Sequence, residues 1–66
     1  MNLTKVMDFG RLYVVFARGR QYRGRAIRIS GTYVDLACGN QVTRLGAREV
    51  KAVLQPSTVD EERFYA

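Results

Sequence analysis

The stretch from Gly19 to Ile29 constrains the fold more than any other part of this 66-residue chain. It begins with a turn glycine and continues as a strand that carries four arginines and a second glycine, Gly24, at its middle. A glycine inside a strand marks a sharp bend or the close approach of another backbone. The apolar pattern also changes phase at Ala26-Ile27, which predicts a bulge. In so short a chain, a strongly bent strand allows a few strands to close into a small barrel.

Length and cysteine content limit how the chain can be stabilised. A domain of this size buries only about 60% of the surface of its unfolded chain. A single cysteine, Cys38, excludes an internal disulfide, and without histidine the usual zinc-ligand patterns are missing. We therefore expect no cofactor or metal, and expect stability from β packing, from association of copies, or from both. One free thiol without an export signal or a membrane-spanning apolar run predicts a cytoplasmic location and no membrane partner.

Local patterns predict an all-β domain with a short N-terminal helix. Leu3, Val6 and Met7 have helical spacing, which indicates one or two turns that end at Gly10 and cover an open end of the β core. Runs of β-branched, aromatic or alternating residues predict strands at 12–17, 21–29, 33–38, 41–45 and 50–55. Turns are expected at 18–20, 30–32 and 39–40, and a single helical turn at 46–49.

These elements assemble into one domain at 1–57, which we predict to be a small, strongly bent five-stranded barrel. In the third strand, Val34, Leu36 and Cys38 are expected to face inward, and Tyr33 and Asp35 outward. Residues 58–66 form an acidic tail. Thr58 and Glu61 can cap a last helical turn there, and a disordered tail is the equal alternative.

The net charge of +5 is unevenly spread along the chain. Six arginines and no acid lie between Arg11 and Arg28, whereas three of the six acids lie in the tail at 60–62. Arginine outnumbers lysine nine to two. This bias favours planar, bidentate contact with phosphate or carboxylate, and stacking on bases.

Basic and aromatic residues on a β surface suit single-stranded RNA or DNA, because phosphates supply affinity and stacking tolerates any base. Tyr13 is a further candidate for stacking. Arg44 and Arg48 either extend the basic surface or pair with Asp35 and Glu49, and the tail acids either are solvated or fold back on the arginines. The predicted nucleic-acid contacts are Arg18, Arg20, Tyr22, Arg23, Arg25, Arg28, Tyr33, Arg44 and Arg48.

Catalysis is not predicted. The chain has no histidine, no paired carboxylates in its body and no phosphate-cradling glycine loop.

The run from Val14 to Ile29 resembles the start of the Sm-like fold, because Gly19 and Gly24 fall where that family places its turn and bend glycines. The stretch from Gly39 to Ser57 is similar to the close of the bacterial Sm-like RNA chaperones of the Hfq type. The resemblance covers 12–57 and implies RNA binding. It also implies a hexameric or heptameric ring in which strand four of one copy pairs with strand five of the next.

Two features depart from the family. Arg48-Glu49 stands near the Lys-His pair of Hfq-type proteins, so the basic residue is kept and the histidine is not. Ser30-Gly31-Thr32 occupies the turn where Sm proteins carry the Asp and Asn that bind uridine.

Glycines with the spacing of Gly19 and Gly24 also occur in Src-homology-3-like modules. A protein-interaction module of that kind, which binds an acidic protein, is the alternative interpretation.

Overall fold

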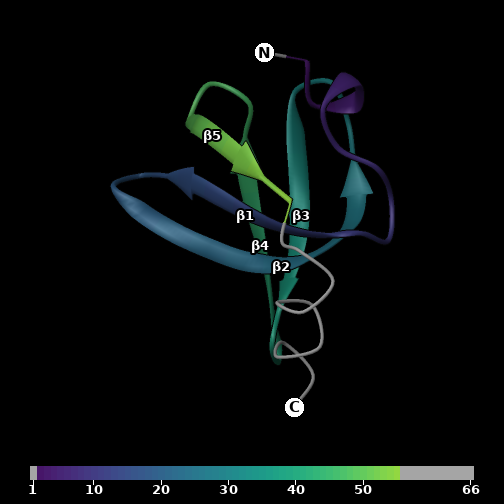
Figure 1. Cartoon of the computed structure of the whole chain (residues 1–66), viewed down its shortest axis with the longest axis vertical. Coiled ribbons are helices and arrows are strands. Elements are labelled where there is room, and N and C mark those ends of the chain that lie inside the picture. Colours follow the sequence, from purple (N-terminus) through teal and green to yellow (C-terminus); the bar gives the residue numbers. More distant parts are fainter. Residues whose placement is uncertain (1, 56–66) are drawn as a thin grey trace.

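The computed structural model describes residues 2–55 and contains five strands preceded by one short turn of helix (Figure 1). The predicted tail at 58–66, with its Thr58–Glu61 cap, lies outside the described residues. The elements are η1 (Leu3–Lys5), β1 (Leu12–Ala17), β2 (Arg20–Ile29), β3 (Tyr33–Cys38), β4 (Gln41–Gly46) and β5 (Val50–Leu54). The all-β prediction is confirmed, and each predicted strand is present with bounds that differ by at most one residue.

The strands form one antiparallel sheet in the order β4-β3-β2-β1-β5. A flat sheet would place its edge strands about 19 Å apart, since four spacings of about 4.8 Å separate them. Residues 47–49 nevertheless join β4 to β5, and the Glu49 N–H donates to the Gly46 carbonyl at 2.9 Å. The sheet therefore curls until its two edges meet at this turn.

Curling does not close the sheet into a hydrogen-bonded barrel. Within residues 2–55, no ladder joins β4 to β5, and both strands remain edges. Figure 1 shows β1 and β2 running across the view while β3 and β4 run nearly perpendicular to them. A single turn is predicted at 46–49, and residues 47–49 form one, which the hydrogen bond from the Glu49 N–H to the Gly46 carbonyl closes, without a regular helix.

The bend in β2 arises where the sequence predicted it. The β2–β3 register shifts between Ala26 and Arg28, which makes Ile27 the bulged residue. Because the bulge adds one residue, Arg28 returns to the same side of the sheet as Arg25. Gly24 is buried in the middle of the strand and lies directly against the backbone of Ala37 in β3.

Two-residue turns close both regular hairpins. Arg18 and Gly19, between β1 and β2, have φ of 53° and 70°, the pattern of a type I′ turn. Gly39, the first loop residue between β3 and β4, has φ of 62°, as in a type II′ turn. Positive φ is uncommon for arginine, so Arg18 adopts a conformation that other contacts must hold.

The core lies on the inner face of the curled sheet. Its largest fully buried side chains come from β1, β3 and β4 and from the N-terminal segment: Leu3, Val15, Val34, Leu36 and Leu45. The predicted N-terminal helix is a single 3-10 turn, and the Asn2 side chain caps it by accepting a hydrogen bond from the Thr4 N–H. Since Leu3 and Met7 join the core cluster, this segment covers one end of it as expected.

Candidate nucleic-acid interface

Four arginines lie together on the outer face of the sheet, opposite the core, and we call Arg23, Arg25, Arg28 and Arg44 the arginine face. Directly opposed residues in neighbouring strands point to the same side of a sheet. Arg23 opposes Val14, and Arg25 opposes Ala37. Arg28 and Arg44 both oppose Asp35, from β2 and β4 respectively. The bulge in β2 thus gathers arginines that a regular strand would have divided between two faces.

The four arginines of the arginine face differ in whether their guanidinium groups are already engaged in an ion pair or a hydrogen bond within the protein. Arg23 and Arg28 are exposed, and within residues 2–55 neither forms an ion pair. Arg25 is half-buried and donates a hydrogen bond to the Gly10 carbonyl, which ties β2 to the segment that precedes β1. Arg44 is committed to Asp35.

Arg44 binds Asp35 with two hydrogen bonds, from Nε at 2.8 Å and from Nη2 at 3.1 Å. Its guanidinium carbon also lies 4.2 Å from the centroid of the Tyr33 ring. These hydrogen bonds hold the pKa of the Asp35 carboxyl below its usual range, against the opposing effect of burial. The sequence allows Arg44 either to extend the basic surface or to pair with Asp35, and the structure shows the pair.

The prediction that Asp35 faces outward is confirmed, but the Asp35 side chain is not open to solvent. Asp35 does lie on the outer face, but Arg44 covers it, and its side chain is only 11% exposed. The hairpin register contains the signal that could have shown this. The two-residue loop at 39–40 pairs Cys38 with Gln41 and therefore Asp35 with Arg44.

Arg18, predicted as a phosphate contact, joins two ends of the curled sheet. From the β1–β2 turn, its Nε contacts a Glu49 carboxylate oxygen at 2.5 Å, and its Nη2 donates to the Arg44 carbonyl at 3.1 Å. The Arg18 hydrogen bond is the main reason that the pKa of Glu49 is lowered. Arg18 thus connects the tip of β1–β2 to β4 and to the β4–β5 turn.

Two of the three tyrosines considered for base stacking lie away from the arginine face. Tyr13 is buried, and its hydroxyl accepts a hydrogen bond from the Asp8 N–H at 2.6 Å. Tyr22 opposes Val15 and packs partly buried against the core. Tyr33, half-buried beside Arg44, is the tyrosine that the structure brings to the arginine face.

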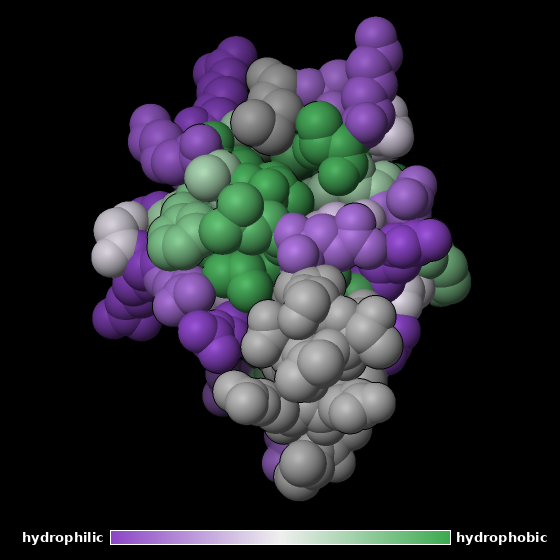
Figure 2. All heavy atoms as spheres, viewed as in Figure 1, coloured by the Kyte–Doolittle hydropathy of each residue, from purple (hydrophilic) through white to green (hydrophobic). Residues whose placement is uncertain are grey.

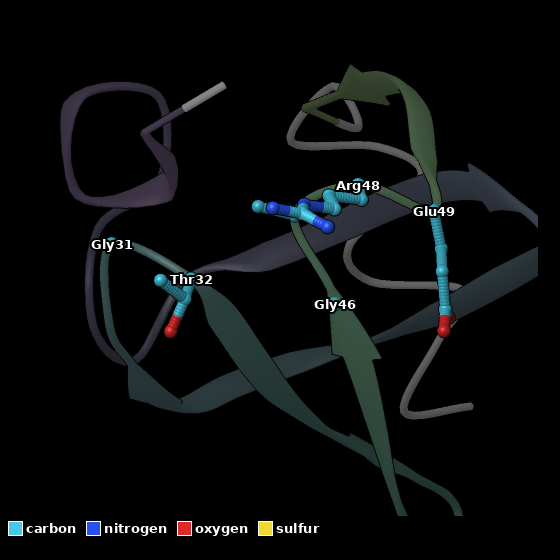
Figure 3. Close-up of a pocket in the computed structure, with 6 residues that line it drawn as sticks. Gly31, Thr32, Gly46, Arg48 and Glu49 are labelled. Carbon is cyan, nitrogen blue, oxygen red and sulfur yellow. The ribbon is translucent and has the colours of Figure 1, made fainter.

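Arg48 and Arg20 lie apart from the arginine face. Arg48 lines an open pocket of about 540 Å³ between the β2–β3 turn and the β4–β5 turn. In Figure 3 its side chain extends on the side of Gly31 and Thr32, whereas the Glu49 side chain points away from it. Arg20 is exposed at the β1–β2 turn and opposes Ala17. Neither arginine forms an ion pair within the described part of the chain.

Apolar side chains occupy the outer face beside the arginines. Val14 opposes Leu54, and Phe16 opposes Ala52, so this side of β1 and β5 is apolar. Figure 2 shows the hydrophobic patch over β1 and β5 with hydrophilic residues around it. Leu54 is 55% exposed on the β5 edge, and Val42 is 61% exposed on the β4 edge. Within residues 2–55, both edges of the sheet therefore present apolar side chains.

Comparisons with known protein families, with curated proteins and with solved structures found no match to this chain. Within residues 2–55 there is no group of three or more metal-ligating side chains. The same residues contain no helix of the length and apolarity needed to cross a bilayer.

Proposed function

We propose that this protein is an Sm-like nucleic-acid-binding protein that contacts single-stranded RNA through the arginine face and assembles as a ring of identical copies. The observation that carries the proposal is the placement of Arg23 and Arg28, which are exposed on one face without an ion pair within residues 2–55. Exposed guanidinium groups on a β surface attract phosphates and release counterions. Arg25, Arg20 and Arg48 extend the positive field around them.

Salt dependence tests this role of the arginine face. Each phosphate contact on a single strand contributes about 0.7 to the slope of log affinity against log salt. We expect the double variant Arg23→Ala/Arg28→Ala to bind labelled single-stranded RNA with a slope lower by about 1.4 than that of the wild type. Fluorescence anisotropy between about 50 and 200 mM salt measures this slope.

The matched control is Lys5→Ala/Lys51→Ala, which removes the same charge from exposed positions outside the arginine face. It should leave the slope unchanged. Equal loss in both double variants would show that only total charge matters. A wild-type protein that binds no RNA but captures an acidic protein after nuclease treatment would favour the Src-homology-3-like alternative.

The ring in this proposal is supported by the two free edges of the sheet. Unpaired edge strands are normally covered or blunted, and a repeated β4-to-β5 contact between copies would cover both in one closed assembly. The exposed Val42 and Leu54 lie on the edges that would meet. Burial of these side chains would add to the core of a small domain.

The mass in solution tests the ring. We expect a hexamer or heptamer for the wild type by light scattering, and a shift to monomer for Leu54→Lys, because a charge would then be buried at the β5 edge. Phe9→Lys is the control, since Phe9 is 76% exposed and precedes the sheet. A monomeric wild type would contradict the assembly and leave the test of RNA binding intact.

A further inference from the structure

Arg28, Asp35 and Arg44 form one row across three neighbouring strands of the outer face. The register places Asp35 directly opposite both arginines, Arg28 on β2 and Arg44 on β4. The row therefore holds two positive charges and one negative charge. Arg44 is hydrogen-bonded to the carboxylate, whereas Arg28 acts on it through charge without a hydrogen bond within residues 2–55, so the two arginines are not equivalent.

Arg44 is held on two sides of its guanidinium group. Asp35 accepts hydrogen bonds from Nε and Nη2, which occupies one edge of the group. The Tyr33 ring covers one side of it, with 4.2 Å between the guanidinium carbon and the ring centroid. The Arg44 side chain is nevertheless 60% exposed, so a large part of it faces solvent in a fixed orientation.

This arrangement suits a base better than a phosphate. Asp35 compensates the charge of Arg44, which weakens its attraction for a phosphate and leaves little counterion release to gain. A fixed, planar guanidinium group is a stacking surface for an unpaired base. Arg28, which forms no ion pair within residues 2–55, lies in the same row to contact the adjoining phosphate.

We propose that Arg44, supported by the Tyr33 ring, is a stacking platform for a single-stranded nucleobase, with Asp35 as the positioning residue that fixes its orientation. This inference rests on the proposed function and assigns different roles within it. Arg23 and Arg28 contact phosphates, and Arg44 contacts a base. The ligand is a strand whose bases are unpaired, because a base inside a duplex is already stacked on its neighbours.

Arg44→Lys tests the platform because lysine keeps the charge and removes the planar group. We expect binding to single-stranded RNA to weaken about five- to tenfold, the lower part of the range for loss of one stacked base. The slope against salt should stay unchanged. Binding to an abasic strand of the same length should not change at all. Arg23→Lys is the control, and this substitution should change the affinity for the normal strand and for the abasic strand by the same factor.

Asp35→Asn tests the positioning role. The substitution leaves Arg44 without a compensating charge, so we expect the salt slope to rise by about 0.7 on both strands. The preference for the normal strand over the abasic strand should disappear, since the guanidinium group is no longer fixed. If Asp35 had only a structural role, Asp35→Asn would instead lower the affinity for both strands in proportion to the loss of thermal stability. Tyr33→Leu provides a second variant that should lower only the base-dependent part of binding.

The outcomes separate this inference from the function on which it rests. Equal weakening of both strands by Arg44→Lys would make Arg44 a phosphate contact and overturn the platform, with RNA binding retained. A wild type that binds the abasic strand as tightly as the normal strand would also overturn it. Failure of the wild type to bind either strand would overturn the proposed function itself.

Discussion

Replacement of Gly24 by alanine is expected to cost about 3 kcal/mol, at the upper end of the range for overpacked sites. A Cβ atom at this position would lie 2.6 Å from the Ala37 carbonyl oxygen and 2.9 Å from its carbonyl carbon. It would also lie 3.0 Å from the Cys38 sulfur. The Ala37 atoms belong to the backbone of β3, which cannot retreat without loss of its pairing with β2.

This cost is large relative to the stability available. A domain of 66 residues has a free energy of unfolding of about 3–10 kcal/mol. Gly24→Ala should therefore remove between about a third and all of the free energy of unfolding, which circular dichroism in a urea titration measures. Because β2 carries Arg23, Arg25 and Arg28, loss of the bend would also disperse the arginine face.

Gly46→Ala is the matched control for Gly24→Ala. A Cβ atom at Gly46 would meet nothing closer than the Glu49 side chain, at 3.8 Å, and Gly46 does not have positive φ. We expect a change in the free energy of unfolding within about 1 kcal/mol, in either direction. If the two variants proved equally stable, the close approach of β2 and β3 at Gly24 would not be a constraint on the fold.

The strands and the bend could be predicted because their signals are local. The β-branched and aromatic run at 12–17 and the glycine turns fix where strands begin and end. The change of phase at Ala26-Ile27 predicted a bulge, which the structure has between Ala26 and Arg28. These features depend on neighbours in the sequence and are therefore readable without tertiary contacts.

The division of the arginines into engaged and free groups could not be read in the same way. Arg18 reaches Glu49 and the Arg44 carbonyl only because the sheet curls, which brings the β1–β2 tip to the other end of the chain. Arg25 likewise finds the Gly10 carbonyl through the path of the N-terminal segment. Such contacts depend on long-range geometry. Composition and alternation therefore could not separate the nine predicted nucleic-acid contacts into residues that are engaged within the protein and residues that are exposed.

Truncation of Leu3 to alanine is expected to destabilise the protein by about 2–5 kcal/mol, the range for buried leucines. Leu3 is completely buried, although it belongs to a three-residue helical turn that would not be stable alone. The segment is held against the sheet by hydrogen bonds from the Gly10 N–H to Ala26 at 2.7 Å and from the Asp8 N–H to Tyr13 at 2.6 Å. Those polar contacts fix its path, and the leucine fills the end of the core.

Val6→Ala is the control for Leu3→Ala, because Val6 lies in the same segment and is 47% exposed. We expect it to change the free energy of unfolding by less than about 0.5 kcal/mol. Urea titrations of the two variants measure the difference. Equal, small effects would mean that the sheet is stable without its N-terminal cover. A large effect of Leu3→Ala alone would show that the core of this curled sheet is complete only when residues outside the strands fill its open end.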